Sequence, residues 1–360
     1  MSPELLTVAE VAASGWAIAA AQEPDGAIPW SVGGHTDVWN HVEATMALLV
    51  AGRMAEAERA WAWVRETQRH DGSWPRKVVR GSVEDASGET NMAAYVAVGV
   101  WHHWLVRHDL GFVVAHWPAV RRALDLVCRL QLPFGGIAWS QEWDDDGPAR
   151  TNQEALLAGS ASTHQALRAG LSLAELLGDS QPEWELTAGR LGHALRHHRE
   201  LFLDKSTFSM DWYYPVLGGA VRGEAGRRLL EARWESFVVP GLGARCVDSH
   251  PWVTGAETCE LALALDAVGD RERARAVFAA ARRLRQPDGS YWTGYVYTDG
   301  VPWPAEHTTF TTAAVLLAHD ALAAVTLGGG VFRGTGLVPD PEPLALGCGC
   351  ASADALAGRA

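Results

Sequence analysis

Apolar residues recur at intervals of three and four along most of the chain, which is the period of an amphipathic helix. Four such stretches end in similar turns: 13–22 before "QEPDG", 57–68 before "QRHDG", 120–131 before "QLPFG" and 273–286 before "RQPDG". Glycine accepts a positive φ at such a turn, and aspartate bonds its own backbone. Each motif therefore predicts the end of an outer helix and a corner that turns the chain inward.

Six further helical stretches, rich in small apolar residues, follow loops of this kind. They lie at 33–52, 87–105, 160–178, 213–230, 254–270 and 306–322. Ser, Thr, Asp or Glu near each beginning suits an N-cap or a first turn, and the alternating pattern of β-strands is scarce. Six outer–inner pairs predict an all-α fold, an (α/α)6 toroid over residues 1–326. Residues 327–360 are predicted to be a tail, partly disordered.

The charge and the cysteines of the chain exclude several classes of protein. A net charge of −13 over 360 residues argues against nucleic acid and anionic membrane surfaces as partners. No apolar run approaches the roughly 20 residues of a spanning helix, and no signal peptide is visible. The five cysteines are scattered and odd in number, which does not suggest a disulfide framework. We expect a cytoplasmic protein, and the sequence is compatible with a homo-oligomer.

The aromatic composition points to a sugar-binding surface. The chain has 17 Trp against 8 Phe and 6 Tyr, and a buried Trp must find a partner for its N–H. In a helical toroid the loops before the inner helices converge on one face, where acids, indoles and amides suit sugar recognition. The candidate sugar-binding residues in these loops are Trp30, His35, Trp39, Asn40, His41, Asp85, Asn91, His164, Asp211, Tyr213, Tyr214, Trp252, Thr254, Trp292 and His307.

Two carboxylates among these loops are candidates for glycoside hydrolysis, which needs one proton donor and one base or nucleophile. We expect the first and fifth loops to lie across the ring, so that Asp37 faces Glu257. An apolar helix follows Glu257, which favours its neutral, proton-donating form, whereas the polar neighbours of Asp37 keep it ionised. A carboxylate in a first helical turn also serves the helix dipole. Glu43 and Glu260, deeper in their helices, are expected to form salt bridges. No cofactor or metal is implied.

Two resemblances bear on fold and function. The corners at 68–74 and 285–291 resemble repeats of the prenyltransferase and squalene cyclase superfamily, whose members are α/α barrels, but the acid motifs of those enzymes are not present in the second half of the chain. The segments "GGHTDVWNHVEATMAL", "MDWYYPVLGGAVRGEA" and "PWVTGAETCELALALDAVGD" are similar to actinobacterial prenyltransferase-like proteins. The mycobacterial α-endomannosidases that cut methylmannose polysaccharide are among those proteins.

The second resemblance implies an inverting glycoside hydrolase that acts on α-1,4-linked mannose or 3-O-methylmannose oligosaccharides. It would have Glu257 as its acid and Asp37 as its base. Two alternatives stay open at this point. An isoprenoid-processing enzyme of the same fold would have an apolar funnel and would need Mg²⁺ or zinc, and a non-catalytic carbohydrate-binding protein would show no turnover.

Overall fold

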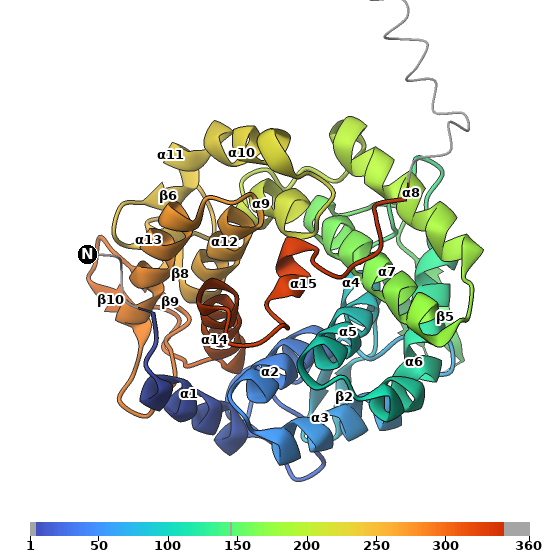
Figure 1. The fold of residues 1–360 in the computed structure, drawn as a ribbon, viewed down its shortest axis with the longest axis horizontal. Helices are drawn as coiled ribbons and strands as arrows, with labels where there is room; N and C mark the ends of the chain where they lie inside the picture. Colours follow the sequence, from blue (N-terminus) through green and yellow to red (C-terminus); the bar gives the residue numbers. More distant parts are fainter. Residues whose placement is uncertain (1–4, 145, 342–360) are drawn as a thin grey trace, which may run out of the picture.

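Two concentric rings of helices form the body of the protein (Figure 1), in a computed structural model that describes residues 5–144 and 146–341. The outer ring consists of α1 (Val8–Ala21), α3 (Met54–Thr67), α6 (Leu110–Arg129), α8 (Pro182–His197), α10 (Gly223–Ala232) and α13 (Arg271–Ala281). The inner ring consists of α2 (Val38–Val50), α4 (Thr90–Ala94) continued by α5 (Val96–Arg107), α7 (Leu157–Leu177), α9 (Ser209–Leu217), α12 (Gly255–Ala267) and α14 (Thr309–Ala323). Successive inner helices are in contact, and α14 also packs on α2 and closes the ring. The predicted (α/α)6 toroid is confirmed.

The two rings differ in burial because of where they pack. Every residue of α2 is buried, since an inner helix contacts two inner neighbours and its outer partner. By contrast, α3 buries only one stripe of its surface, which includes Trp61 and Trp63. A helix that is apolar all round belongs in the interior, and a helix with one apolar stripe belongs at the surface. The hydrophobic pattern therefore assigns each helix to its ring.

Glycine corners after α1, α3, α6 and α13 join each of these outer helices to the next one. At the end of α3 the Nε2 of Gln68 donates to the carbonyl oxygen of Gly72 at 3.1 Å and to that of Ala119, in α6, at 3.0 Å. Gly72 has φ 102°, and a Cβ there would lie 2.1 Å from the carbonyl oxygen of Arg122. Only glycine permits both this conformation and this close approach.

The same arrangement recurs around the outer ring. Gln22 bonds the carbonyl oxygen of Glu56 in α3, and Gln131 bonds that of Thr187 in α8. At the last corner Gly289, with φ 91°, lies against the backbone of Ala13 in α1 and so closes the outer ring. The repeated motif is a structural joint between neighbouring outer helices.

One predicted helix is in fact two. The stretch 213–230, predicted as a single inner helix, contains the end of α9 at Leu217 and the start of α10 at Gly223. Between them the backbone packs tightly, because a Cβ at Gly218 would lie 2.1 Å from the carbonyl oxygen of Ala161. Gly219 has φ 85°. The two glycines therefore turn the chain from the inner to the outer ring.

Short antiparallel strands fill the loops that lead into the inner helices. They are β1 (Lys77–Val79) with β2 (Ser82–Asp85), β3 (Gly88–Glu89) with β4 (Ser140–Asp144) and β5 (Gly147–Thr151), and the sheet of β6 (Val238–Val239), β7 (Gly243–Arg245), β8 (Trp252–Thr254), β9 (Gly294–Val296) and β10 (Val301–Pro302). β3 runs directly into α4 and β8 into α12. These strands therefore surround the end of the barrel at which the inner helices begin.

The C-terminal segment closes the other end. Residues 327–341, predicted as the first part of a tail, cross the middle of the ring in Figure 1 and include α15 (Gly330–Arg333). Val331 and Phe332 are buried, and the Nε of Arg333 lies 2.6 Å from Asp266 in the last turn of α12. This part of the predicted tail is thus packed into the barrel. The remainder, residues 342–360, lies outside the described residues.

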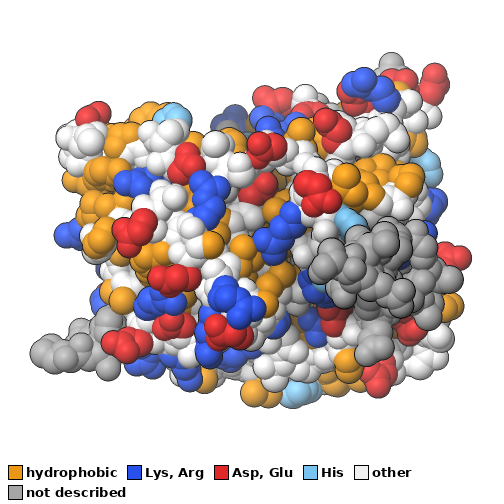
Figure 2. Space-filling model, turned by 90° about the horizontal axis from the view of Figure 1, so that it is seen from above, with side chains coloured by type: hydrophobic (Ala, Val, Ile, Leu, Met, Phe, Trp, Pro, Cys, Tyr) orange, Lys and Arg blue, Asp and Glu red, His pale blue; other side chains and the backbone are white. Residues whose placement is uncertain are grey.

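Among the described residues no helix is long and apolar enough to cross a membrane. On the face drawn in Figure 2, Lys and Arg side chains are interspersed with Asp and Glu. Such mixing is compatible with the expectation that the chain does not bind nucleic acid.

Candidate active site

Aromatic rings from three inner helices meet near the middle of the barrel. Trp39 of α2 stacks on Tyr95, which lies between α4 and α5, with ring centroids 4.0 Å apart and planes at 17°. Tyr214 of α9 lies 6.3 Å from the ring of Trp39. Trp39 is 7% exposed and Tyr214 3%. These rings lie among the inner helices. The C-terminal segment covers one end of the barrel, and we call the other end, at which the inner helices begin, the open end.

Two buried glutamates lie among these rings. The hydroxyl of Tyr95 donates to Glu43 of α2. Those of Tyr213 and Tyr214 donate to the two oxygens of Glu260 of α12, the second at 2.6 Å. Glu43 is 6% exposed and Glu260 5%. We predicted that these two glutamates form salt bridges. This prediction is wrong, because among the described residues their carboxylates accept hydrogen bonds from tyrosine hydroxyls instead of pairing with basic side chains.

Burial changes the proton affinity of both glutamates. It raises the pKa of Glu43 to about 7, against the hydrogen bond from Tyr95. Burial also raises the pKa of Glu260 to about 8, and the charges of Glu257 and Glu43 add to this while the two tyrosine hydroxyls oppose it. Desolvation disfavours the charged form of a carboxyl, and a nearby carboxylate disfavours it further. At neutral pH this cluster therefore retains protons.

Glu257, the predicted proton donor, lies one turn before Glu260 in the first turn of α12 and is partly exposed. Its carboxyl hydrogen-bonds with the thiol of Cys246, whose pKa is raised by burial and by the charge of Glu257. Glu257 also interacts electrostatically with Tyr213. It thus stands between the buried cluster and the open end.

Asp37, the predicted base, is the N-cap of α2. Its Oδ1 accepts from the backbone N–H of Asn40 at 2.9 Å, its Oδ2 accepts from the side-chain amide of Asn40, and His35 lies 3.6 Å away. Asp37 is 2% exposed. The cap contact shows that Asp37 has the structural role of an N-cap residue.

From their order in the sequence, we expected the first and fifth inner helices to lie opposite each other. The structure shows that they do not. α14 contacts both α2 and α12, so a single helix separates them. In a closed ring of six helices the first helix faces the fourth, and the fifth is its second neighbour. Side chains of the two helices still interact across the centre, since Glu43 raises the pKa of Glu260.

Further aromatic residues lie along the loops at the open end. Trp30 stacks on His35 with ring centroids 6.2 Å apart and on Phe310 at 5.5 Å, and its Nε1 donates to Glu306 at 3.0 Å. Trp292 meets the ring of His307 edge-on at 4.0 Å. All of these side chains are partly exposed. Phe310 and Glu306 are therefore candidate contacts that our sequence-based set omits, although Glu306 directly precedes His307, which that set includes.

Of the remaining predicted residues of this end, Trp252 and Asp85 have protein partners of their own, whereas the buried hydroxyl of Thr254 has none among the described residues. Trp252 donates to the carbonyl oxygen of Trp303 at 2.7 Å. Asp85 accepts from Ser87, and a guanidinium nitrogen of Arg76 lies 3.8 Å from its other oxygen. Two others complete the set: Asn91, in the first turn of α4, and Thr254, the N-cap residue of α12.

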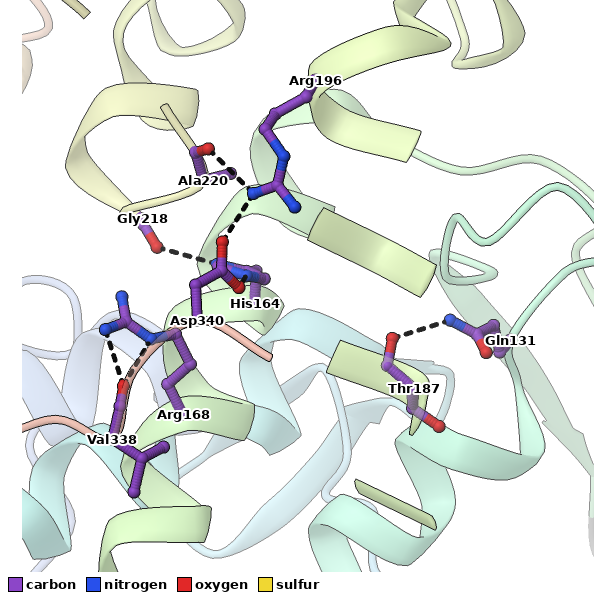
Figure 3. A network of polar contacts seen from close by, with 9 residues as sticks. All are labelled: Gln131, His164, Arg168, Thr187, Arg196, Gly218, Ala220, Val338 and Asp340. Atoms are coloured by element: carbon purple, nitrogen blue, oxygen red, sulfur yellow. Dashed lines mark hydrogen bonds and ion pairs between the residues drawn. The ribbon is translucent and has the colours of Figure 1, made fainter. Parts of the chain in front are cut away.

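Two histidines predicted to bind sugar instead form hydrogen bonds within the protein. The Nδ1 of His41 accepts from the backbone N–H of Ile28 at 3.1 Å, and its Nε2 lies 2.9 Å from the carbonyl oxygen of Ala60. Burial lowers the pKa of His41 to about 4. The Nε2 of His164 lies 2.9 Å from Asp340 in the C-terminal segment (Figure 3). Both histidines have 0% exposure, so we remove them from the sugar-binding set.

Asp211 and Tyr213 also act within the protein. Asp211 accepts from the backbone N–H of Ala158, in the first turn of α7, at 3.2 Å, and burial raises its pKa to about 6. It lines a cavity of about 510 Å³ formed by residues of α9 and α10 and the segment before α9. Tyr213 is 0% exposed. Tyr213 therefore affects the site through Glu260, and Asp211 stabilises the start of α7.

Solved structures share this architecture. A wild-type glycosidase matches with a TM-score of 0.66 at 15% identity, over 88% of this chain and 98% of its own. The GH63 mannosylglycerate hydrolase of Thermus thermophilus matches with a TM-score of 0.63 at 14% identity, over 86% and 99%. A D-mannose isomerase matches with a TM-score of 0.63 at 10% identity, over 87% and 95%. The fold is that of the glycosidase-type (α/α) barrels, and likeness at this level of identity concerns the fold alone.

The sequence comparison is more specific. No family model matches the chain. However, the chain is 55% identical over 335 residues to the MMP endo-(1,4)-3-O-methyl-alpha-D-mannosidase of Mycolicibacterium hassiacum, a match that spans 93% of this chain and 92% of that protein. The chain belongs to this family of endomannosidases and is a glycoside hydrolase, so the predicted resemblance is confirmed. The isoprenoid and non-catalytic alternatives are set aside on this ground.

Proposed function

We propose that this protein cleaves α-1,4 bonds within 3-O-methylmannose oligo- or polysaccharide, with inversion at the anomeric carbon. Glu257 donates a proton to the leaving oxygen, and Asp37 accepts a proton from the attacking water. The observation that carries the proposal is the 55% identity to an endo-acting methylmannosidase over nearly the whole of both chains. The resemblance implies the roles of the two acids.

The surroundings of the two acids suit different roles. Glu257 lies in the first turn of α12 and is partly exposed, so its carboxyl can approach the oxygen of a glycosidic bond. Asp37 accepts two hydrogen bonds from Asn40, and these donors hold its carboxylate in place. Pairs of carboxyls in such contrasting environments supply the acid and the base of glycosidases.

The open end of the barrel supplies surfaces that suit a pyranose. Aromatic faces cover the C–H side of a sugar, and carboxylates, amides and imidazoles bond its hydroxyls. We propose as platforms Trp30, Trp39, Tyr214, Trp252 and Trp292, and as hydroxyl partners His35, Asn40, Asp85, Asn91, Thr254 and His307. Since the C-terminal segment packs against the far ends of the inner helices, the polysaccharide would enter from the end at which those helices begin.

The test is incubation with defined α- and β-linked manno- and gluco-oligosaccharides, with and without 3-O-methyl groups. Products are identified by mass, and the anomer first released is identified by NMR. We expect internal cleavage of the methylated α-1,4 mannosides and first release of the β-anomer. First release of the α-anomer would contradict inversion, and failure to cleave any methylated mannoside would contradict the substrate.

The distance between the carboxyls is a second test of the stereochemical outcome. In a ligand-bound crystal structure, inversion requires about 6.5–9.5 Å between the carboxyls of Asp37 and Glu257, which leaves room for the water. A separation near about 5.5 Å would indicate retention instead.

The proposal includes a cytoplasmic location. It is supported by the free thiols of Cys128, Cys246 and Cys259, because reducing compartments keep cysteines unpaired. Fractionation of cells that produce the protein, followed by immunodetection, tests this part. Recovery from an extracellular fraction would contradict it.

A further inference from the structure

We propose that Trp252 and Trp303 form a binding subsite at the rim of the open end, where a 3-O-methylated mannose residue of the polysaccharide packs its C–H face and its methyl group against the two indoles. This inference rests on the proposed function, because the ligand is part of the proposed substrate. It adds Trp303, which our sequence-based set omits. It also gives the enzyme a physical means to prefer methylated over unmethylated α-1,4 mannosides.

Trp303 is an exposed side chain on a fixed backbone. It directly follows β10 and is 53% exposed. Its N–H donates to the carbonyl oxygen of Gly294 in β9 at 3.0 Å, and its own carbonyl oxygen accepts from the Nε1 of Trp252 at 2.7 Å. Both contacts hold the main chain, so the indole of Trp303 is not needed for them. Leaving such a large apolar group in water forgoes the free energy of its burial, which a ligand packed on it would recover.

A glycine in the neighbouring strand fixes the position of Trp252. A Cβ at Gly294 would lie 2.4 Å from the Nε1 of Trp252 and 2.6 Å from the carbonyl oxygen of Val253. A glycine inside a strand often marks such a close approach. Any larger residue would displace the indole of Trp252 and, with it, the hydrogen bond to Trp303. Gly294 therefore sets the positions of both residues.

The two indoles form a corner that suits a methylated sugar. The rings of Trp252 and Trp303 meet edge-on, with centroids 4.8 Å apart and planes at 83°, a favoured arrangement for an aromatic pair. One ring can cover the C–H side of a pyranose, and the other forms an apolar wall for a methoxy group. The hydroxyl of an unmethylated sugar at that wall would lose its water without gaining a hydrogen-bond partner, which is unfavourable.

The pair is continuous with the proposed sugar-binding surface. β8 contains Trp252 and runs directly into α12, whose first turn carries Glu257. The loop after Trp303 leads to Glu306, which accepts a hydrogen bond from Trp30. A polysaccharide that enters from this end would therefore meet the pair before it reaches Glu257. This continuity, and not exposure alone, identifies the polysaccharide as the ligand.

The first test compares kcat/KM for methylated and unmethylated α-1,4 mannosides of equal length in the wild type and in Trp303→Ala. We expect the preference for the methylated substrate to fall about fourfold, the factor that corresponds to about 0.8 kcal/mol for one buried carbon group. The loss should lie in KM for the methylated substrate, with kcat unchanged, because the pair contains neither acid. A folded Trp303→Ala variant with the preference of the wild type would overturn the proposal.

The conservative variant Trp303→Phe tests whether the aromatic face is the cause. Phenylalanine keeps a flat apolar ring and leaves both backbone hydrogen bonds of the residue in place. We expect a preference closer to that of the wild type than to that of Trp303→Ala. If the preference in Trp303→Phe is as low as in the alanine variant, the ring face does not bind the methyl group and the proposal is wrong.

Trp117→Ala is the matched control. Trp117 of α6 also meets another indole edge-on, that of Trp184 at 5.6 Å, and its Nε1 donates to Asp179. It lies at the opposite end of the barrel, because Asp179 follows the end of α7. We expect the folded control variant to keep the preference of the wild type. An equal loss in both variants would mean that the loss of any such indole changes the preference, and the proposal would fall.

A readout without activity observes the subsite directly. Nitrogen-15 NMR of tryptophan-labelled protein follows the indole N–H signals, and the signal of Trp303 is identified by its loss in Trp303→Ala. The probes are a methylated α-1,4 mannoside and its unmethylated counterpart, added to Glu257→Gln protein. We expect the Trp303 signal to shift at lower concentrations of the methylated probe. A signal that stays in place while the probe shifts other indoles would overturn the inference.

The two readouts separate this inference from the proposed function. If the wild type cleaves no methylated mannoside but the probe shifts the Trp303 signal, the proposed function is wrong and the subsite is supported. If the wild type cleaves methylated mannosides but neither the preference nor the signal depends on Trp303, only the subsite is wrong.

Discussion

The carboxylate of Asp340 lies 2.9 Å from the Nε2 of His164, across 176 residues of sequence. Its other oxygen accepts from Arg196 of α8, and the Nδ1 of His164 lies 3.3 Å from the carbonyl oxygen of Gly218 (Figure 3). One side chain thus joins the C-terminal segment to an inner and an outer helix. Its contacts lead to the first of four predictions.

Asp340→Asn will lower the free energy of unfolding at neutral pH and make that free energy depend less on pH in the acid range. Burial alone would raise the pKa of Asp340, but the hydrogen bond from His164 and the charge of Arg196 lower it to about 2. An aspartate in an unfolded chain has a pKa of about 3.9. The stabilisation is therefore complete above about pH 4 and is lost as the pH falls toward about 2. We expect a loss of about 1–2 kcal/mol at pH 7, allowing for partial exposure.

Urea unfolding from pH 2 to pH 7 measures this effect. Asp204→Asn is the control, because Asp204 is an exposed aspartate with only local contacts. Equal unfolding free energies for Asp340→Asn and the wild type at pH 7 would show that the C-terminal segment is not held by this contact.

Glu257→Gln and Asp37→Asn will both lower kcat while leaving oligosaccharide binding measurable. Loss of a general acid or base costs about 10²–10⁴-fold in rate. Asp37 also caps α2, but asparagine is as good an N-cap residue as aspartate, so neither Asp37→Asn nor Glu257→Gln should lose much stability. Calorimetric binding and thermal unfolding accompany the rate measurements. Full activity in either variant would refute the role assigned to that residue.

Gly72→Ala will destabilise the barrel far more than Gly52→Ala. Both glycines have positive φ, which costs an alanine about 1–2 kcal/mol. Only at Gly72 would the new Cβ meet the backbone, at 2.1 Å from Arg122, whereas nothing lies within 4 Å at Gly52. Overpacking adds about 1–3 kcal/mol, so we expect a total of about 3 kcal/mol for Gly72→Ala. Similar midpoints in urea for the two variants would contradict the role of the corner as a joint.

His41→Ala and Trp292→Ala will separate folding from binding. His41 bonds two backbone groups, which the substitution leaves unpaired at a cost of about 2 kcal/mol of stability, with KM unchanged. Trp292 is partly exposed, and its loss should raise KM about tenfold, equivalent to about 1.4 kcal/mol. Thermal unfolding and initial rates check both. A raised KM in a folded His41→Ala variant would return His41 to the sugar-binding set.

The helices and corners were predictable because their signals are local. A period of 3.6 residues, a glycine at positive φ and an aspartate that bonds two residues ahead each act within a few positions, as at Asp71 and Ser73. The sequence also indicated its family, since long segments such as 33–48 and 251–270 match relatives directly. It failed at the break after Leu217, where the two glycines respond to a close approach by α7.

The membership of the site was decided by tertiary packing. Asn40 and His41 are adjacent in sequence, and we predicted that both bind sugar. Adjacent side chains on a helix point about 100° apart. In the structure His41 packs outward on α3, whereas Asn40 contacts Asp37. Glu43 and Glu260 acquired their tyrosine partners, and His164 its aspartate, only when the ring closed. The sequence by itself determined the repeating hairpins and the kinship of this enzyme, because both depend on neighbouring residues. The folded barrel determined which acids are buried together, because that depends on residues far apart in the chain being brought together away from water.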